Sequence, residues 1–214
     1  MADWPTISAL ATAGGTLALA GVTLASVRSA NRAARVAEQS LLAAQRPLLV
    51  TARADDPAQK VGFRDDVWFY VEGSRAVASA TSEAVYLVIP LRNAGTGIAV
   101  LHGWFLYPEL PTGADAAPTP LDEFTRLTRD LYVAPGDTGF WQGSFRDPRS
   151  EEYRAARRAI EAQERMSIDI LYSDFEGGQR LISRFMLTAR QGDDGVIWFA
   201  SIGRHWNVDR PSPR

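Results

Sequence analysis

The pattern of hydrophobic and polar positions changes twice along the chain. Residues 6–27 contain no charged side chain, whereas residues 28–46 mix arginine with apolar residues repeating at i, i+3, i+4 and i+7. From Leu48 onward, apolar residues come in short runs rich in Val, Ile, Phe, Tyr and Trp, separated by Gly, Pro, Asn and Asp. The period of 3.6 predicts a long N-terminal helix, and the short runs predict a following β domain.

The uncharged run at residues 6–27 is long enough to be a membrane span. A helix needs roughly 20 mostly apolar residues to cross the hydrocarbon core, and this run has about that length. A buried helix of a soluble core is the alternative. A cleaved signal peptide would need positive charge before the apolar core, but the first arginine, Arg28, follows it. We interpret the run as an uncleaved transmembrane helix.

The charges beside this run predict its orientation. Arg28, Arg32 and Arg35 lie on its C-terminal side, and positively charged residues next to a span stay in the cytoplasm. We therefore expect a single-pass protein of the cell membrane, with the N-terminus outside and the C-terminal domain cytoplasmic. Trp4 is expected at the outer lipid interface, where indole rings concentrate. The lipid bilayer is thus the first predicted partner.

Small residues recur within the predicted span. Their 3,4,3,4 spacing places them on one stripe of the helix, at Ala11, Gly14, Ala18, Gly21 and Ala25. Such stripes let two membrane helices approach closely, so one interpretation is a homodimer formed through the transmembrane helix. The alternative is that an Ala- and Gly-rich span produces this spacing by chance.

The helical pattern continues into a juxtamembrane stalk. No Gly or Pro interrupts residues 28–46 before the final Pro47 step, so one helix is expected from about Thr6 to Gln45. Pro47 ends it, because the residue before a proline is pushed out of the α region. Three uses of the apolar stripe stay open: pairing of stalks, packing on the domain, or contact with the membrane surface.

Eight runs after the stalk are predicted strands. They are LLVTAR, VWFYV, VYLVIPL, IAVLHGWFLY, TGFWQGSF, SIDILY, RLISRFML and VIWFASIGRHW. Tight turns are expected at Asn93-Ala-Gly-Thr-Gly and at Glu176-Gly-Gly. One helix is expected from Asp147, as N-cap, to about Arg165, with Tyr153, Ala156 and Ile160 facing inward. A loop containing four prolines covers residues 108–120.

The fold class predicted from these elements is mainly β, and the strand pattern fits a sandwich or a barrel. We predict an antiparallel sandwich with one inserted helix, preceded by the long transmembrane and stalk helix. The expected division is a short extracytoplasmic N-terminus (residues 1–5), the transmembrane helix (6–27), the stalk (28–46), the β-sandwich domain (47–208) and a flexible tail (209–214).

Charge and composition exclude several classes of binding partner and site. The chain has a formal net charge of -2, and residues 47–214 carry 19 Lys and Arg against 23 Asp and Glu. A mildly acidic domain argues against nucleic acid, which requires a basic face. The absence of cysteine excludes disulfides, thiolate metal sites and thiol nucleophiles. No cofactor and no metal is expected.

Candidate chemistry in the β domain is sparse. Gly95 and Gly97 could begin a dinucleotide-binding fingerprint, but the third glycine of that motif and the helix that should follow it are missing. His102 and His205 are the only histidines, without metal-ligand spacing around them. Acidic pairs such as Asp55-Asp56 lie in turn-like positions. The strand tryptophans are predicted core residues, with an exposed pair among Trp141, Trp198 and Trp206 as the alternative.

The chain resembles a loose group of uncharacterised bacterial single-pass membrane proteins with an N-terminal transmembrane helix and an immunoglobulin-like β-sandwich domain. The matching stretches are SVRSANRAARVAEQSLLAAQRPLLV, LRNAGTGIAV, VAPGDTGF and YSDFEGGQR. The resemblance covers most of the chain and rests on structural turns. It implies an immunoglobulin-like fold and a membrane topology, and it implies no activity.

Two functional hypotheses follow from different classes. The first is a non-enzymatic, membrane-anchored interaction module at the cytoplasmic face, which binds a protein partner that the sequence does not identify. The second is a membrane-bound enzyme or small-ligand binder that uses His102 or His205 with nearby acids. They are distinguished by geometry, because the second requires both histidines and an Asp or Glu to open into one cleft.

Overall fold

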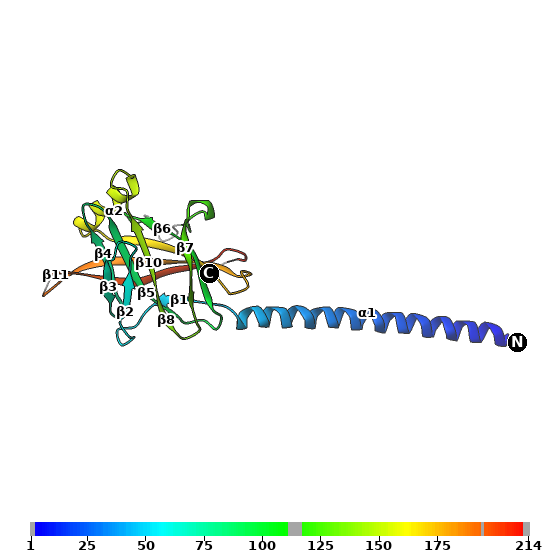
Figure 1. Ribbon diagram of the computed structural model, residues 1–214. Helices are drawn as coiled ribbons and strands as arrows, with labels where there is room; N and C mark the ends of the chain where they lie inside the picture. Colours follow the sequence, from blue (N-terminus) through cyan, green and yellow to red (C-terminus); the bar gives the residue numbers. More distant parts are fainter. Residues whose placement is uncertain (1–2, 111–116, 194, 212–214) are drawn as a thin grey trace. The chain divides into compact units, whose positions relative to one another are not determined.

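The computed structural model describes residues 3–110, 117–193 and 195–211, and the side chains of residues 4–7, 10, 11 and 130 lie outside that description. The chain divides into two compact units, Met1–Ala44 and Gln45–Arg214. The fold is mainly antiparallel β with two helices (Figure 1). Of the predicted loop at 108–120, residues 111–116 lie outside the described residues, as do residues 212–214 of the predicted tail.

Helix α1 (Trp4–Ala44) makes up the first unit and is continuous over 41 residues, as the sequence predicted. Leu17, Leu19 and Val22 on this helix are exposed, Leu17 to 74%. Among the residues that the structure describes, no helix combines the length and the apolar character needed to cross a membrane.

The residues predicted as membrane anchor all fall on α1. The side chains of Trp4 and Ala11 lie outside the described residues. The other seven are exposed: Gly14, Ala18, Gly21, Ala25, Arg28, Arg32 and Arg35. A Cβ added at Gly14 or Gly21 would meet no atom within 4 Å, so the small-residue stripe has open space in front of it. Homodimer formation through this stripe stays a prediction.

The second unit contains the strands, a 3-10 turn and the second helix. Their bounds are β1 (Leu49–Thr51), β2 (Gln59–Gly62), β3 (Trp68–Val71), β4 (Arg75–Ala80), β5 (Val85–Asn93), β6 (Ala99–Tyr107), η1 (Leu121–Glu123), β7 (Thr125–Val133), β8 (Thr138–Phe145), α2 (Glu151–Glu161), β9 (Met166–Ser173), β10 (Arg180–Gly192) and β11 (Gly195–Asn207). The eight runs predicted from the sequence each contain or overlap one of these strands. Strands β2, β4 and β7 were missed.

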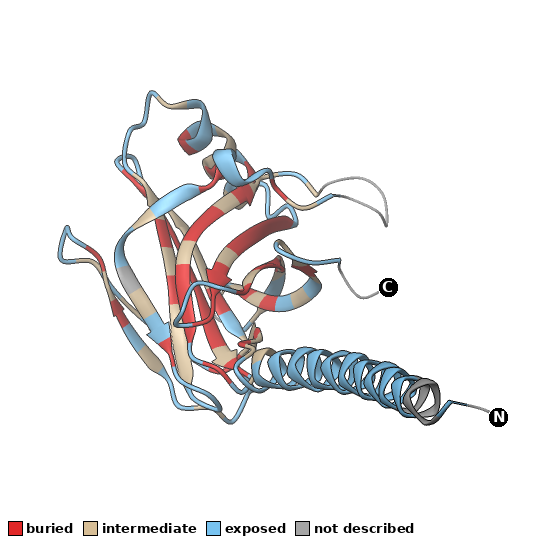
Figure 2. Cartoon of the chain, turned by 90° about the vertical axis from the view of Figure 1, so that its right-hand side faces the viewer, coloured by how far each residue is buried: buried red, intermediate tan, exposed pale blue. Residues whose placement is uncertain are grey.

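The main sheet has two halves joined at one edge. One half contains β1, β4, β5 and β8, and the other runs β11-β10-β9-β6-β7. They join where β4 pairs with β11, Ala76 opposite Trp198. The main hydrophobic core draws on both halves, including Leu87 and Ile89 from β5 and Ile168 and Ile170 from β9. Figure 2 shows the buried residues concentrated along these strands, an arrangement that fits the predicted β-sandwich.

A second, smaller core lies under the β2–β3 hairpin. Val61 and Val71 from the hairpin pack with Tyr86 and Val88 of β5. The opposite face of the hairpin exposes Trp68, which is 55% accessible and packs closely over Gly62. The prediction that the strand tryptophans are core residues is therefore confirmed for Trp104, Trp141, Trp198 and Trp206, which are buried. The alternative, an exposed pair among Trp141, Trp198 and Trp206, is wrong.

Helix α2 is shorter than the sequence indicated. Its N-cap is Ser150, whose hydroxyl accepts from the Tyr153 N–H, and the helix ends at Glu161. Asp147 instead accepts from the Arg149 N–H in the preceding turn, so the Asp-Pro signal marked the turn rather than the cap. The helix cannot reach Arg165 because Gln163 has a positive φ of 56° and β9 begins at Met166.

Candidate functional site

The sheet is open between β7 and β8. Strand β7 pairs only with β6, and β8 pairs only with β5, in the part of the chain that the structure describes. A short turn through Gly136 connects the two strands. Each therefore presents a free edge, and an edge strand has unpaired N–H and C=O groups along its outer side.

Strand β7 bulges beside this opening. Leu131 pairs with Leu101, and Arg126 pairs with Gly103. Between these two pairs β6 has one residue and β7 has four, so β7 contains three extra residues. The extra residues lie between these two pairs, where Thr128 and Arg129 occur. Bulges bend a strand and redirect its side chains, and they are common next to functional sites.

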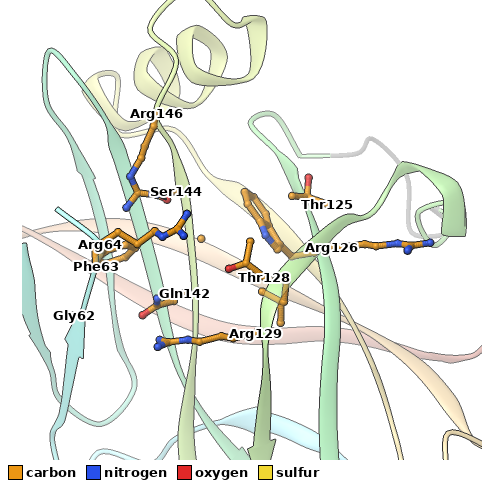
Figure 3. Close-up of a pocket in the computed structure, with 13 residues that line it drawn as sticks. Gly62, Phe63, Arg64, Thr125, Arg126, Thr128, Arg129, Gln142, Ser144 and Arg146 are labelled. Atoms are coloured by element: carbon orange, nitrogen blue, oxygen red, sulfur yellow. Dashed lines mark hydrogen bonds between the residues drawn. The ribbon is translucent and has the colours of Figure 1, made fainter.

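A cleft of about 500 Å³ occupies the opening between the two strands. Its walls come from β7, from β8 and the residues after it, and from the end of the β2 hairpin. The lining includes four arginines, Arg64, Arg126, Arg129 and Arg146, and the neutral polar side chains of Thr125, Thr128, Gln142 and Ser144. Figure 3 shows Arg64 and Arg146 near Ser144 and Arg129 extended toward Gln142, whereas Arg126 points to the other side of β7.

One of these arginines has an acidic neighbour. Arg146 lies 3.4 Å from Asp65 and also donates to the Ser144 hydroxyl. Asp65 in turn accepts a hydrogen bond from the Tyr86 hydroxyl. That bond is the largest cause that lowers the pKa of Asp65, with Arg146 contributing in the same direction. Asp65 is thus held as a carboxylate at the rim of the cleft.

The other arginines keep their charge available. Among the side chains that the structure describes, none offers Arg64, Arg126 or Arg129 a carboxylate within 4.0 Å. Gln142 can hold Arg129 and Gly62 together. With its amide turned so that the oxygen and nitrogen exchange places, the oxygen accepts from Arg129 Nη2 at 3.1 Å and the nitrogen donates to the Gly62 carbonyl at 3.3 Å. The cleft therefore gathers positive charge on a domain with an excess of acidic residues.

This arrangement suits the binding of oxyanions. Guanidinium groups present a planar fork of donors that matches carboxylate or phosphate, and hydroxyl and amide groups beside them supply further hydrogen bonds. The lining includes neither histidine nor a carboxylate, and the described residues contain no group of three or more His, Cys, Asp or Glu that could hold a metal ion.

The two histidines do not meet. His102 lies on β6 and His205 on β11, with β9 and β10 between them, a separation of about 14 Å across the sheet. His102 Nε2 contacts the hydroxyl of Ser173, which is itself buried. The geometry that the enzyme hypothesis requires for a shared histidine cleft is therefore absent from the described residues.

His205 belongs to a buried hydrogen-bonded chain. Its Nδ1 lies 2.6 Å from Ser183 Oγ, which lies 2.9 Å from the Tyr172 hydroxyl. Tyr172 also accepts from the Leu49 N–H. A serine beside a histidine resembles a nucleophile with its base, but Ser183 and Tyr172 are both fully buried. These hydrogen bonds join β1, β9, β10 and β11.

Because of His205, we expect the folded domain to lose stability in mild acid. Burial, and secondarily the charge of Arg46, lower its pKa below the ordinary 6.5. The unfolded chain then binds the proton more tightly, so stability is complete above pH 6.5 and falls as the pH drops toward the folded-state pKa. The free energy of unfolding changes by at most about 1.4 kcal/mol per pH unit through this one histidine. Urea denaturation between about pH 7.5 and 5 is expected to show a smaller loss for His205→Gln than for the wild type; equal losses would contradict this assignment.

Sequence reasoning missed the cleft because it missed β7. The stretch TRLTRDLYV has few apolar residues, so it did not register as a strand. Charged residues on an edge strand are nevertheless common, because they prevent pairing with other chains. Arg126 and Arg129, which follow the proline-rich loop, could have indicated a charged edge strand at this position. Arg64 lies in the turn after β2 and Arg146 directly follows β8, and neither position was predicted as part of a site.

Comparison with protein-family models, with curated proteins and with solved structures finds no match. The resemblance to bacterial single-pass membrane proteins with an immunoglobulin-like domain therefore stays a prediction.

Proposed function

We propose that this chain is a membrane-anchored, non-enzymatic interaction module, with α1 as the anchor and the β domain as the part that binds a protein partner at the cytoplasmic face. The observation that carries the proposal is the N-terminal run without charge. Between Asp3 and Arg28 no side chain is charged, and the large apolar residues described there are exposed on α1.

Exposed apolar residues on a long helix need a cover. Burying one Leu or Val side chain fully is worth roughly 1.5–3 kcal/mol, and Leu17, Leu19, Val22 and Leu24 each leave more than half of their surface open. In this proposal a bilayer supplies that cover, because the uncharged run at residues 6–27 has the length of a span. The run includes residues whose side chains lie outside the described part of the chain, in which no span is found. Arg28, Arg32 and Arg35 favour a cytoplasmic location for the stalk and the β domain.

The β domain supports the binding half of the proposal. Two sheet halves around one core are what an immunoglobulin-like sandwich would require, the fold that the resemblance implies, and such sandwiches serve as scaffolds for binding sites. The arginine-lined cleft is a surface with binding chemistry. The separated histidines favour this function over the enzyme hypothesis.

Membrane fractionation tests the anchor. The full chain is expected in the membrane fraction after alkaline carbonate washing. Leu17→Arg/Leu19→Arg/Val22→Arg should move it to the supernatant, because each arginine at the centre of a span costs roughly 2.5–3.5 kcal/mol. The matched control, Val36→Arg/Gln39→Arg/Leu41→Arg, adds the same charge within residues 28–46 and should stay with the membrane. Recovery of the wild-type chain in the supernatant would refute the anchor.

A reporter that is active only in the periplasm, fused at the C-terminus, tests the orientation of the anchor. Activity of this reporter would refute the cytoplasmic location of the β domain.

A further inference from the structure

We propose that the arginine-lined cleft binds an extended acidic segment of a partner protein, which adds as a strand along the free edge of β8. The inference rests on the proposed function for the existence of a protein partner. It identifies the chemistry of that partner: acidic residues alternating with apolar ones, in extended conformation.

The free edge of β8 supplies the backbone donors and acceptors. Its pairing with β5 is regular from Val85–Phe145 to Arg92–Thr138, without a bulge. A regular strand directs the backbone groups of alternate residues to its unpaired side, and Gln142, Gly143 and Ser144 line the cleft on that side. Peptides add to exposed edges of this kind through main-chain hydrogen bonds.

The arginines supply the charge preference. Arg64, Arg129 and Arg146 come from three separate segments around the cleft. In an extended peptide every second side chain points to the same face, roughly 6.7 Å apart. A segment with acidic residues at alternate positions therefore directs several carboxylates to one side, where several guanidinium groups can each bind one.

The remaining lining selects the other face of the segment. Trp104, which is almost fully buried, and Leu127, which packs against the main core, both contribute to the cleft wall. Apolar side chains at the intervening positions can pack on this wall, since aromatic and aliphatic surface favours apolar contact. A strand with one acidic and one apolar face satisfies both parts of the lining.

Fluorescence anisotropy with the full chain in mild detergent tests the proposal. The probe is a fluorescein-labelled ten-residue peptide of alternating Glu and Val, and the matched control replaces every Glu with Gln. The Glu–Val peptide is expected to bind at least about tenfold more tightly than the Gln–Val peptide. Addition of the Glu–Val peptide should also slow amide hydrogen exchange at Gln142–Ser144.

Matched arginine variants locate the site. Arg129→Glu/Arg146→Glu is expected to weaken binding at least about tenfold, and the milder Arg129→Gln/Arg146→Gln should weaken it in the same direction. Arg149→Glu/Arg165→Glu changes the charge equally at exposed positions outside the cleft and should alter binding by less than about twofold. Circular dichroism checks that each variant is folded.

Two results would overturn the inference. One is no binding of the Glu–Val peptide. The other is equal affinity for a version of the peptide methylated at alternate backbone nitrogens, since this would mean that the cleft recognises carboxylates without strand addition. Neither result bears on the membrane anchor, which the fractionation experiment judges separately.

Discussion

Replacing Asp169 with alanine is expected to lower the free energy of unfolding by about 3–5 kcal/mol, the cost of leaving one partner of a buried ion pair uncompensated. Asp169 is fully buried, and the side chain of its partner Arg184 is 8% exposed. Urea denaturation followed by tryptophan fluorescence measures the loss. A change below about 1 kcal/mol would show that Arg184 finds another partner or water.

The size of this effect follows from the hydrogen bonds that Asp169 accepts. Its Oδ1 accepts from Arg184 Nε at 2.6 Å, and its Oδ2 accepts from Arg184 Nη2 at 2.7 Å. Oδ2 also accepts from the Thr119 hydroxyl and backbone N–H. Arg184 is enclosed by the rings of Tyr107 and Trp206, with centroids at 4.8 and 4.9 Å. Burial alone would lower the pKa of Arg184, yet Asp169 keeps it raised above the ordinary value.

A double variant separates the charge from the packing. Asp169→Leu/Arg184→Met removes both charges and keeps apolar volume, so it should recover most of the stability that Asp169→Ala loses, as replacement of buried ion pairs often does. Some loss is expected to remain, because Thr119 and the Ala117 carbonyl also lose their partners. A double variant as unstable as the single one would place the effect in packing instead.

The apolar content of each segment decided how much of the fold the sequence could predict. Strands β5, β6 and β9 face the core with Val, Leu and Ile, and were expected because buried strands read as apolar runs. Strand β4, with the sequence RAVASA, and β2, with QKVG, are short and mixed, so their tertiary contacts outweigh a weak local signal. The helix α2 was expected, but its cap was assigned three residues too early.

The site depends on contacts that sequence position does not reveal. Arg64 and Arg146 lie far apart in the chain and come together only because the β2 hairpin packs beside β8. The two histidines, which the enzyme hypothesis relied on, lie on separate strands and form local hydrogen bonds. Chemistry that arises from several ordinary arginines needs the strand order before it can be recognised. In this domain the cleft lies between β7 and β8, so it could not be located without recognising β7 as a strand.

Replacing Asn93 with alanine is expected to lower the free energy of unfolding by about 2–4 kcal/mol, because it leaves several backbone groups without partners at once. The Asn93 side chain is fully buried. Its Nδ2 donates to the carbonyls of Gly97 and Val133, at 2.7 and 3.0 Å. Its Oδ1 accepts from the N–H groups of Leu48 and Gly95. One side chain thus joins the start of β1, the turn after β5 and the end of β7.

Asn93→Asp tests whether hydrogen bonding rather than volume carries this effect. The aspartate has nearly the same shape and can still accept from Leu48 and Gly95, but it directs an oxygen at the carbonyls of Gly97 and Val133. At neutral pH the loss should equal or exceed that of the alanine variant, since an unpaired charge is then buried. Protonation restores a donor, so the difference from wild type measured at the same pH should shrink as the pH falls. A pH-independent difference would mean that the turn rearranges around the new side chain.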